Sequence, residues 1–226
     1  MDPISESLRQ HYFKKFALHG ASPEGVDWGS DLKKVYLRYE KMLAVLNGIS
    51  NNEVVSLLDV GCGYGGLLQY LISEQKQLQI EYTGIDVAEN MISWAMGELP
   101  AGNFLHGNIF EHSFEKTYDY VVCSGILTQK LEAAGLKMDA FASQLIRQIF
   151  SLCRVGIAFN VMSTKVNYYS NNLYYRNPVE LISWCSTEIT TYFKIDHSYP
   201  LYEYTIYLYR NPVEMVSMRE TKDVGG

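Results

Sequence analysis

The apolar positions of the first 50 residues follow a helical period. They recur every three or four residues over 5–18 and again over 32–46, a spacing that places them on one face of a helix. A loop rich in glycine and proline separates the two segments, and either Ser30 or Asp31 is suited to cap the second helix. We therefore expect an N-terminal helical cover over residues 1–50.

From residue 54 the pattern changes to short apolar runs that alternate with amphipathic segments. The runs have the length of buried strands, and seven strands are predicted at residues 54–60, 80–86, 103–108, 117–125, 155–163, 191–199 and 203–210. Helices are predicted at residues 65–75, 88–99, 137–153 and 178–187. Such alternation is typical of a Rossmann-like α/β fold, in which a doubly wound and mainly parallel sheet has right-handed crossovers.

The end of the chain departs from this pattern. Only a short turn at Pro200 separates the last two predicted strands, whereas a parallel crossover needs a dozen or more residues. We expect these strands to form an antiparallel hairpin. A polar, tyrosine-rich segment near 163–177 reads as an insertion, whose phenols could line a pocket for a polar acceptor. The whole chain, 1–226, is predicted to be one domain, with the core at 51–226.

Composition narrows the possible partners. The chain has 226 residues, 47% of them hydrophobic, and a formal net charge of −6, so it can bury a core while its acidic surface disfavours nucleic acid. No apolar run reaches the ~20 residues that cross a bilayer, and the N-terminus lacks the apolar segment of a secretory signal. The four cysteines lack a CxxC pair, which favours reduced thiols over zinc or disulfides. We expect a cytoplasmic monomer or homodimer without metal, membrane or nucleic-acid partners.

A glycine-rich turn follows the first predicted strand. Residues 61–66 read G-C-G-Y-G-G, which satisfies the pattern G-x-G-x-x-G. Glycines let the backbone approach a ligand, and the following helix offers free N–H groups. Asp86, at the end of the second strand, can accept hydrogen bonds from two ribose hydroxyls. These features suit NAD or FAD as well as other adenosine cofactors, so they do not choose between a hydride carrier and a methyl carrier.

Three further features favour a methyl carrier. Asp59, just before the glycines, is awkward beside a pyrophosphate but attracts an ammonium or sulfonium group. The fourth strand ends in the small polar pair Ser124 and Gly125, which suits a flat adenosyl-methionyl ligand lying across the strand tips. The terminal antiparallel hairpin is the third feature, because a regular NAD-binding sheet runs parallel to its edge.

These segments together resemble class I S-adenosylmethionine-dependent methyltransferases, over most of the chain. "LLDVGCGYGG" resembles the first motif of that family, "GIDVAENMI" its acidic second-strand motif, "FLHGNIFE" its third-strand loop and "YDYVVCSGIL" its fourth-strand motif, while "EYTIYLYR" matches its antiparallel last strand. The resemblance implies S-adenosyl-L-methionine as cofactor and direct in-line methyl transfer to oxygen or nitrogen of a small molecule.

The resemblance also implies the binding site. The residues expected to bind the cofactor are Arg38, Asp59, Gly61, Cys62, Gly63, Asp86, Val87, Met91, Asn108, Ile109, Ser124 and Gly125. Asn108 stands where the family often has an aspartate that accepts a hydrogen bond from the adenine amino group, and its amide oxygen can accept the same bond. Arg38 is expected to pair with the methionine carboxylate, and Tyr12 and Phe16 to form a lid.

The chemistry of the acceptor side is less defined by the sequence. His19, His197 and Tyr168 are the candidate catalytic residues, since a hydroxyl acceptor can need a base. Two alternatives stay open at this point. One is an NAD(P)-dependent oxidoreductase, and the other is a methyltransferase-like protein that binds the cofactor but serves as a catalytically silent regulatory partner.

Overall fold

The computed structural model describes residues 1–50, 52–75 and 77–213. Its centre is one mixed sheet with the strand order β3-β2-β1-β4-β5-β8-β7, and β6 pairs with β5 beside this path. The strands are β1 (Val54–Val60), β2 (Gln79–Asp86), β3 (Asn103–His106), β4 (Tyr118–Cys123), β5 (Cys153–Ser163), β6 (Tyr175–Arg176), β7 (Phe193–Asp196) and β8 (Glu203–Tyr209).

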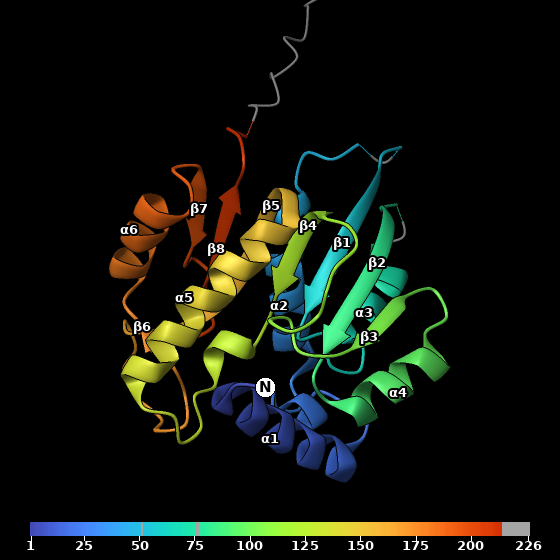
Figure 1. Cartoon of the computed structure of the whole chain (residues 1–226), viewed down its shortest axis with the longest axis horizontal. Coiled ribbons are helices and arrows are strands. Elements are labelled where there is room, and N and C mark those ends of the chain that lie inside the picture. Colours follow the sequence, from blue (N-terminus) through green and yellow to red (C-terminus); the bar gives the residue numbers. More distant parts are fainter. Residues whose placement is uncertain (51, 76, 214–226) are drawn as a thin grey trace, which may run out of the picture.

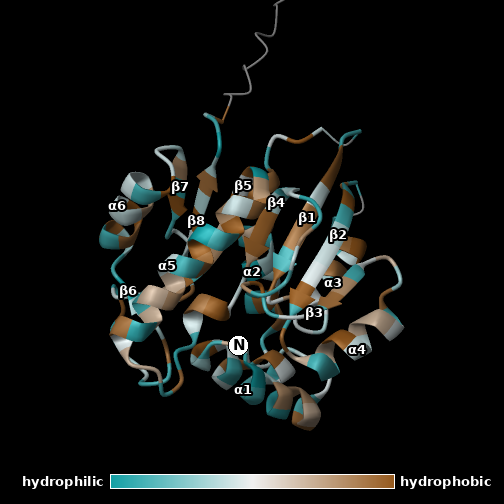
Figure 2. Cartoon of the chain, in the orientation of Figure 1, coloured by the Kyte–Doolittle hydropathy of each residue, from teal (hydrophilic) through white to brown (hydrophobic). Residues whose placement is uncertain are grey.

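Helices cover both faces of the sheet (Figure 1). The α-helices are α1 (Pro3–His19), α2 (Leu32–Leu43), α3 (Gly66–Glu74), α4 (Glu89–Glu98), α5 (Gly135–Leu152) and α6 (Pro178–Glu188). Three short 3-10 helices are η1 (Glu24–Val26), η2 (Ala44–Leu46) and η3 (Ile126–Thr128). One hydrophobic core lies between the sheet and α5 and α6, and a second lies between the sheet and α2, α3 and α4. The central strands are brown along most of their length in Figure 2, as strands buried on both faces are.

The strand directions confirm the predicted fold class. β1 pairs in parallel with β2 and β4, and β4 pairs in parallel with β5, whereas β8 runs antiparallel to both β5 and β7. The seven predicted strands are all present. The predicted insertion near 163–177 additionally contains β6, which pairs with the end of β5; two residues are too few to show a strand period in the sequence.

The N-terminal helices form the predicted cover. The side chain of Asp2 accepts hydrogen bonds from the first turn of α1, and Asp31, rather than Ser30, caps α2 in the same way. α1 crosses the end of the sheet toward which the arrowheads of β1, β2 and β4 point (Figure 1). This is the carboxyl end of the parallel strands, where doubly wound folds bind their ligands.

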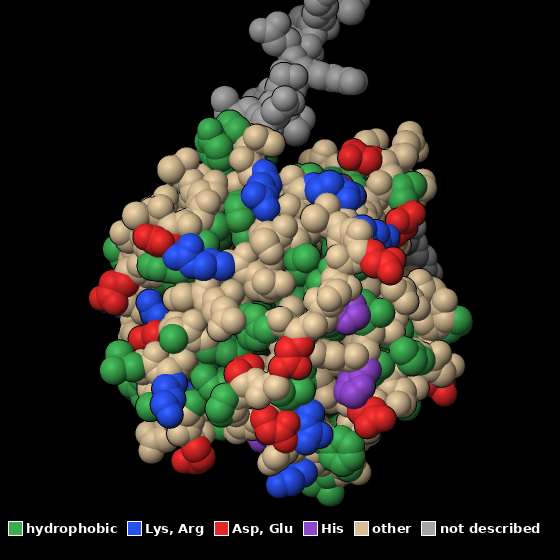
Figure 3. Space-filling model, in the orientation of Figure 1, with side chains coloured by type: hydrophobic (Ala, Val, Ile, Leu, Met, Phe, Trp, Pro, Cys, Tyr) green, Lys and Arg blue, Asp and Glu red, His purple; other side chains and the backbone are tan. Residues whose placement is uncertain are grey.

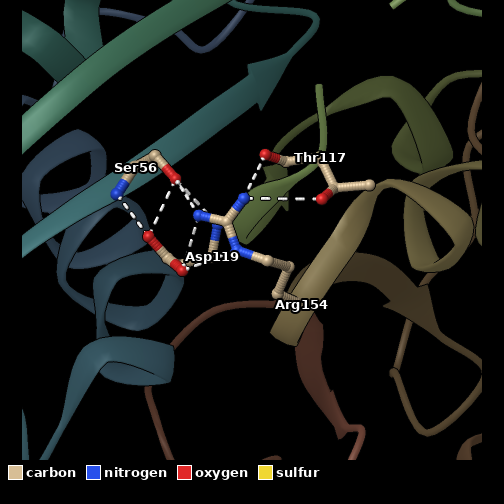
Figure 4. A network of polar contacts seen from close by, with 4 residues as sticks. All are labelled: Ser56, Thr117, Asp119 and Arg154. Carbon is tan, nitrogen blue, oxygen red and sulfur yellow. Dashed lines mark hydrogen bonds and ion pairs between the residues drawn. The ribbon is translucent and has the colours of Figure 1, made fainter. Parts of the chain in front are cut away.

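The opposite end of the sheet is held by a polar network (Figure 4). Arg154, at the start of β5, donates to Asp119 Oδ1 over 2.8 and 3.0 Å and to the carbonyl oxygen of Thr117 over 2.6 Å. Asp119 Oδ2 accepts from the backbone N–H and the hydroxyl of Ser56, both over 2.8 Å. These contacts connect β1, β4 and β5 where no ligand is expected, so they stabilise the sheet.

Replacing Arg154 by alanine is expected to lower the free energy of unfolding by about 1.5 kcal/mol, because several charge-assisted hydrogen bonds are lost together. The melting temperature should fall by about 3–6 °C for a chain of this length. Thermal denaturation with Arg147→Ala as control tests this, since Arg147 pairs with Glu188 on the exposed surface and its loss should cost less than about 0.5 kcal/mol. Equal losses in the two variants would contradict the assignment.

Two smaller observations complete the fold. All four cysteines are buried and unpaired. In the described part of the chain, no helix combines the length and the apolar character needed to cross a membrane.

Candidate active site

A cavity lies at the carboxyl ends of β1, β2 and β4. Its floor comes from the glycine-rich turn, the ends of β2 and β4, and the loop after β3. Its roof comes from the N-terminal cover, with Ser5, Leu8 and Tyr12 of α1 and with Val26 and Trp28 from the segment around η1. The cavity is therefore enclosed between the sheet and the helix that crosses its end.

The turn after β1 has a shape that only glycine adopts without strain. Gly61, Gly63 and Gly65 have φ angles of 78°, 56° and 83°, in the left-handed region that side chains disfavour. A Cβ atom on Gly61 would lie 2.6 Å from Cδ1 of Ile126. The turn thus brings bare backbone to the cavity wall, where a ligand can approach the N–H groups that begin α3.

Asp86 ends β2 and fixes this turn. Its Oδ2 accepts a hydrogen bond from the N–H of Gly63 over 2.9 Å, and its Oδ1 accepts one from the N–H of Ala88 over 2.8 Å. Each carboxylate oxygen has a second lone pair for a ligand hydroxyl. Burial raises the pKa of Asp86 above its usual value, against the effect of these backbone hydrogen bonds.

Asp59 is a second acid in the same cavity, and it is buried. Its side chain is 3% exposed, and its Oδ2 accepts a hydrogen bond from the hydroxyl of Tyr82 over 2.7 Å. Burial raises the pKa of Asp59 to about 7, the charge of Asp86 adds to the rise, and the Tyr82 hydrogen bond opposes it. Among the described residues that line the cavity there is no lysine, arginine or histidine. Such a cavity favours a cationic ligand over a pyrophosphate.

The loops after β3 and β4 present polar groups to the cavity. Within the described chain, the Oγ atom of Ser124 is buried without a hydrogen-bond partner, a state that calls for a ligand or water. The amide oxygen of Asn108 accepts from the N–H of Phe110 over 2.9 Å, so one lone pair is used and another is free for the predicted contact with adenine. The residues present therefore fit an adenosyl ligand that carries an ammonium or sulfonium group.

The cavity brings together eleven of the twelve residues predicted to bind the cofactor. These are Asp59, Gly61, Cys62, Gly63, Asp86, Val87, Met91, Asn108, Ile109, Ser124 and Gly125. Their individual roles toward the cofactor stay predictions. Of the two residues predicted to form a lid, Tyr12 lines the cavity, and Phe16 is buried against Tyr64.

Arg38 does not line the cavity. Its Nε donates to both carboxylate oxygens of Glu203 over 3.1 Å, and its guanidinium lies 5.1 Å from the ring centre of Trp28. Trp28, by contrast, does line the cavity. The buried Nη1 of Arg38 has no hydrogen-bond partner in the described part of the chain, but the pairing with Glu203 leaves the guanidinium outside the cavity lining. The predicted contact with the methionine carboxylate is therefore not placed by this cavity and stays a prediction.

The three predicted catalytic residues lie apart from one another and outside the cavity lining. His19 is exposed at the end of α1, and His197 is exposed with its ring edge-on to Tyr204. Tyr168 lies on the insertion with 61% of its surface exposed. The structure does not bring these side chains together.

A histidine that sequence reasoning missed lies beside the roof. His11 Nε2 is 3.0 Å from Oδ2 of Asp27, whose Oδ1 pairs with Lys15 over 2.7 Å. Hydrogen bonding from His11 is the largest influence that lowers the pKa of Asp27, to about 2, so the carboxylate stays charged. Asp27 stands between Val26 and Trp28 in the chain, and both of these line the cavity. No spacing in the sequence indicates this pair, because a loop with a left-handed residue at Asp27 brings it together.

The raised pKa of Asp59 predicts a pH-dependent affinity for S-adenosylhomocysteine, the product of the expected cofactor. Below pH 7 the acid is neutral, and a cationic amino group binds best to its ionised form, so binding releases a proton. Between pH 8 and pH 6 the affinity should fall about tenfold. Calorimetry on the wild type and Asp59→Asn tests this: the variant should bind more weakly and lose the pH dependence. An identical pH dependence in both proteins would refute the assignment.

Comparison with known proteins agrees with this geometry. Residues 57–148 match the family described as "Methyltransferase domain". Rv1506c, a protein of Mycobacterium tuberculosis that is named as a methyltransferase, is 30% identical to this chain over 153 residues. These are 67% of this chain and 90% of that protein. A small RNA 2'-O-methyltransferase of Schizosaccharomyces pombe is 27% identical over 192 residues, and this chain spans 50% of its length.

Solved structures with bound cofactor share the fold. Magnesium protoporphyrin IX methyltransferase from Synechocystis PCC 6803 with bound SAM matches with a TM-score of 0.62 at 15% identity, over 93% of this chain and 99% of that one. The plantazolicin methyltransferase BpumL, in complex with a pentazolic analogue and SAH, matches with a TM-score of 0.58 at 16% identity, over 91% and 98%. At this identity the likeness establishes the fold rather than the acceptor.

Proposed function

Because the chain belongs to the class I S-adenosylmethionine-dependent methyltransferases, we propose that it methylates a hydroxyl group of a small molecule. The observation that carries the choice of a hydroxyl is the pair formed by His11 and Asp27 over 3.0 Å. A hydroxyl must lose its proton during methyl transfer, whereas a neutral amine can attack without a base. Oxygen is therefore favoured over nitrogen.

The size and charge of the chain support a small acceptor. The cover and the insertion are the main additions to the core, and in the described chain the cover consists of α1, η1, α2 and η2 while the insertion contains only β6. Figure 3 shows lysine and arginine side chains scattered among aspartate and glutamate on the face that it presents, without a continuous basic patch. With a net charge of −6, the surface is poorly suited to the phosphate backbone of a nucleic acid.

The residues of the site have distinct tasks in this reaction. Bound S-adenosylmethionine supplies the methyl group, held by Asp59, Asp86 and the glycine turn. α1 and Trp28 exclude water from the cavity. When Nε2 of His11 donates to Asp27, Nδ1 carries the lone pair that accepts the acceptor's hydroxyl proton, and the carboxylate stabilises the imidazolium that results. Alignment of the two substrates supplies much of the acceleration.

Methyl incorporation from labelled S-adenosylmethionine into two sets of small molecules tests the proposal. One set carries hydroxyl groups and the other carries matched amines. We expect label in hydroxyl compounds, with S-adenosylhomocysteine formed in equal amount. Label only in amines would contradict O-methylation, and tight cofactor binding without transfer to either set would favour a catalytically silent binding protein.

A further inference from the structure

A polar hollow lies between the segment that follows η3 and the insertion. It is lined by Lys130, Leu131, Glu132, Tyr168, Tyr169, Ser170, Asn171 and Asn172. One wall follows η3 and the other belongs to the insertion, so the two walls continue from the carboxyl ends of β4 and β5. The volume is about 510 Å³, within the range of roughly 300–1,000 Å³ that small-molecule sites have. No residue of the hollow belongs to the cofactor cavity.

Hydrogen bonds connect the hollow to the histidine–carboxylate pair. Nδ2 of Asn172 donates to Oε1 of Gln129 over 3.1 Å, and Nε2 of Gln129 donates to Oδ2 of Asp27 over 3.4 Å. The same Asp27 oxygen is the partner of His11. Two amide side chains, those of Asn172 and Gln129, thus lie between a molecule in the hollow and the His11–Asp27 pair. Trp28, the next residue after Asp27, lines the cofactor cavity.

The walls of the hollow are held in place. The carbonyl oxygen of Asn172 accepts from the N–H groups of Lys130 and Leu131 over 2.9 and 3.0 Å, which fastens one wall to the other. Leu131 has a φ of 50°, an unfavourable value for a leucine and of the kind found at ligand sites. The hydroxyl of Tyr169 donates to the carbonyl oxygen of Thr164 over 2.7 Å. A fixed wall lowers the entropic cost of binding.

The side chains of the hollow match one class of ligand. Tyr168 and Tyr169 are 61% and 57% exposed and offer ring faces, while the amides and hydroxyl of the insertion both donate and accept hydrogen bonds. The single lysine and single glutamate give no excess charge, so an anionic group such as a phosphate gains little. A purely apolar ligand finds only Leu131 as an aliphatic partner. A hydroxylated ring combines an apolar face with a polar rim and fits both kinds of surface.

We propose that the polar hollow is the acceptor subsite and that the acceptor is a neutral carbohydrate, bound with a ring on Tyr168 and with hydroxyls on Asn171 and Asn172. The proposal rests on the proposed function and specifies its substrate class. For transfer to occur, the amide side chains of Asn172 and Gln129, which lie between the hollow and Asp27, must move aside so that one hydroxyl of the sugar reaches His11.

Saturation-transfer-difference NMR tests the subsite by binding rather than by turnover. The protein, saturated with S-adenosylhomocysteine, is titrated with methyl glycosides of common hexoses, deoxyhexoses and pentoses, with the corresponding sugar phosphates, and with simple phenols. We expect a neutral glycoside to bind and both Tyr168→Ala and Asn171→Ala to weaken it at least fivefold. Tyr202→Ala removes a phenol that is 55% exposed outside the hollow and should leave the affinity unchanged.

The possible outcomes distinguish failure of the carbohydrate subsite from failure of the proposed O-methylation. Absence of glycoside binding, preference for sugar phosphates or phenols, or unchanged affinity in Tyr168→Ala would overturn the carbohydrate subsite. If another class of hydroxyl compound is then methylated, the proposed O-methylation still holds. Conversely, glycoside binding in the hollow without methyl transfer to any hydroxyl would support the subsite and refute the proposed reaction. Unchanged binding of S-adenosylhomocysteine in all three variants shows that the fold is intact.

Discussion

Asp86→Ala is expected to weaken the binding of S-adenosylhomocysteine by at least about 100-fold, or about 2.7 kcal/mol. The variant removes the carboxylate that we predict to accept two hydrogen bonds from the ribose hydroxyls, and bonds to charged groups contribute about 1.5–3 kcal/mol each. The variant also frees the N–H of Gly63, which Asp86 holds over 2.9 Å, so the glycine turn loses part of its preorganisation. Calorimetric titration measures the change.

Asp119→Asn is the matched control for this variant. Asp119 also accepts a backbone N–H, that of Ser56 over 2.8 Å, but at the opposite end of the sheet (Figure 4). Its replacement should lower the melting temperature and leave the dissociation constant unchanged when measured well below that temperature. If Asp86→Ala bound the product as tightly as Asp119→Asn does, the ribose assignment would be wrong.

His11→Ala is expected to lower kcat for methyl transfer to a hydroxyl acceptor by about 1,000-fold, within the range found for a general base. The affinity for S-adenosylhomocysteine should change less than threefold, because His11 does not line the cofactor cavity. The residual rate should rise with pH as hydroxide replaces the base. Single-turnover kinetics between pH 6 and pH 10 measure both.

Two companion variants separate catalysis from packing of the cover. Gln10 is an exposed neighbour of His11 on α1, and the hydrogen bond that the structure describes for its side chain goes to Glu6. Gln10→Ala should therefore keep the wild-type kcat. Asp27→Asn keeps the shape but not the charge that orients His11, and its kcat should fall about tenfold or more. Equal rates in His11→Ala and Gln10→Ala would eliminate His11 as the base.

The cofactor half of the site could be predicted because its features are local in sequence. The turn at 61–66, the acid that ends β2 and the small residues after β4 each follow a strand whose apolar run is readable by itself. The parallel order of the strands then brings their carboxyl ends together. The type and position of Asp59 predict that it faces a charged ligand, and this role stays a prediction. Its raised pKa depends on burial, which only the fold shows.

The proposed acceptor half could not be predicted from the sequence because its contacts join residues that are distant in sequence. His11 meets Asp27 across a loop, and Gln129 reaches Asp27 from 102 residues away. The ion pair between Arg38 and Glu203 joins residues 165 positions apart, and no sequence pattern on α2 predicts it. The sequence position of His19 favoured it as a catalytic residue. Which histidine lies near the cavity, however, depends on the path of the N-terminal cover, and that path places His11 there.

Calorimetric titration of the wild-type protein with S-adenosylhomocysteine, with NAD as the parallel control, tests the central claim most directly. The account predicts saturable binding of S-adenosylhomocysteine at one site per chain and no measurable heat with NAD, because the described cavity is lined by the buried Asp59 and the partly buried Asp86 and by no basic side chain. Binding of NAD in preference, or of neither ligand, would contradict the assignment of this cavity to the methyl-donor cofactor.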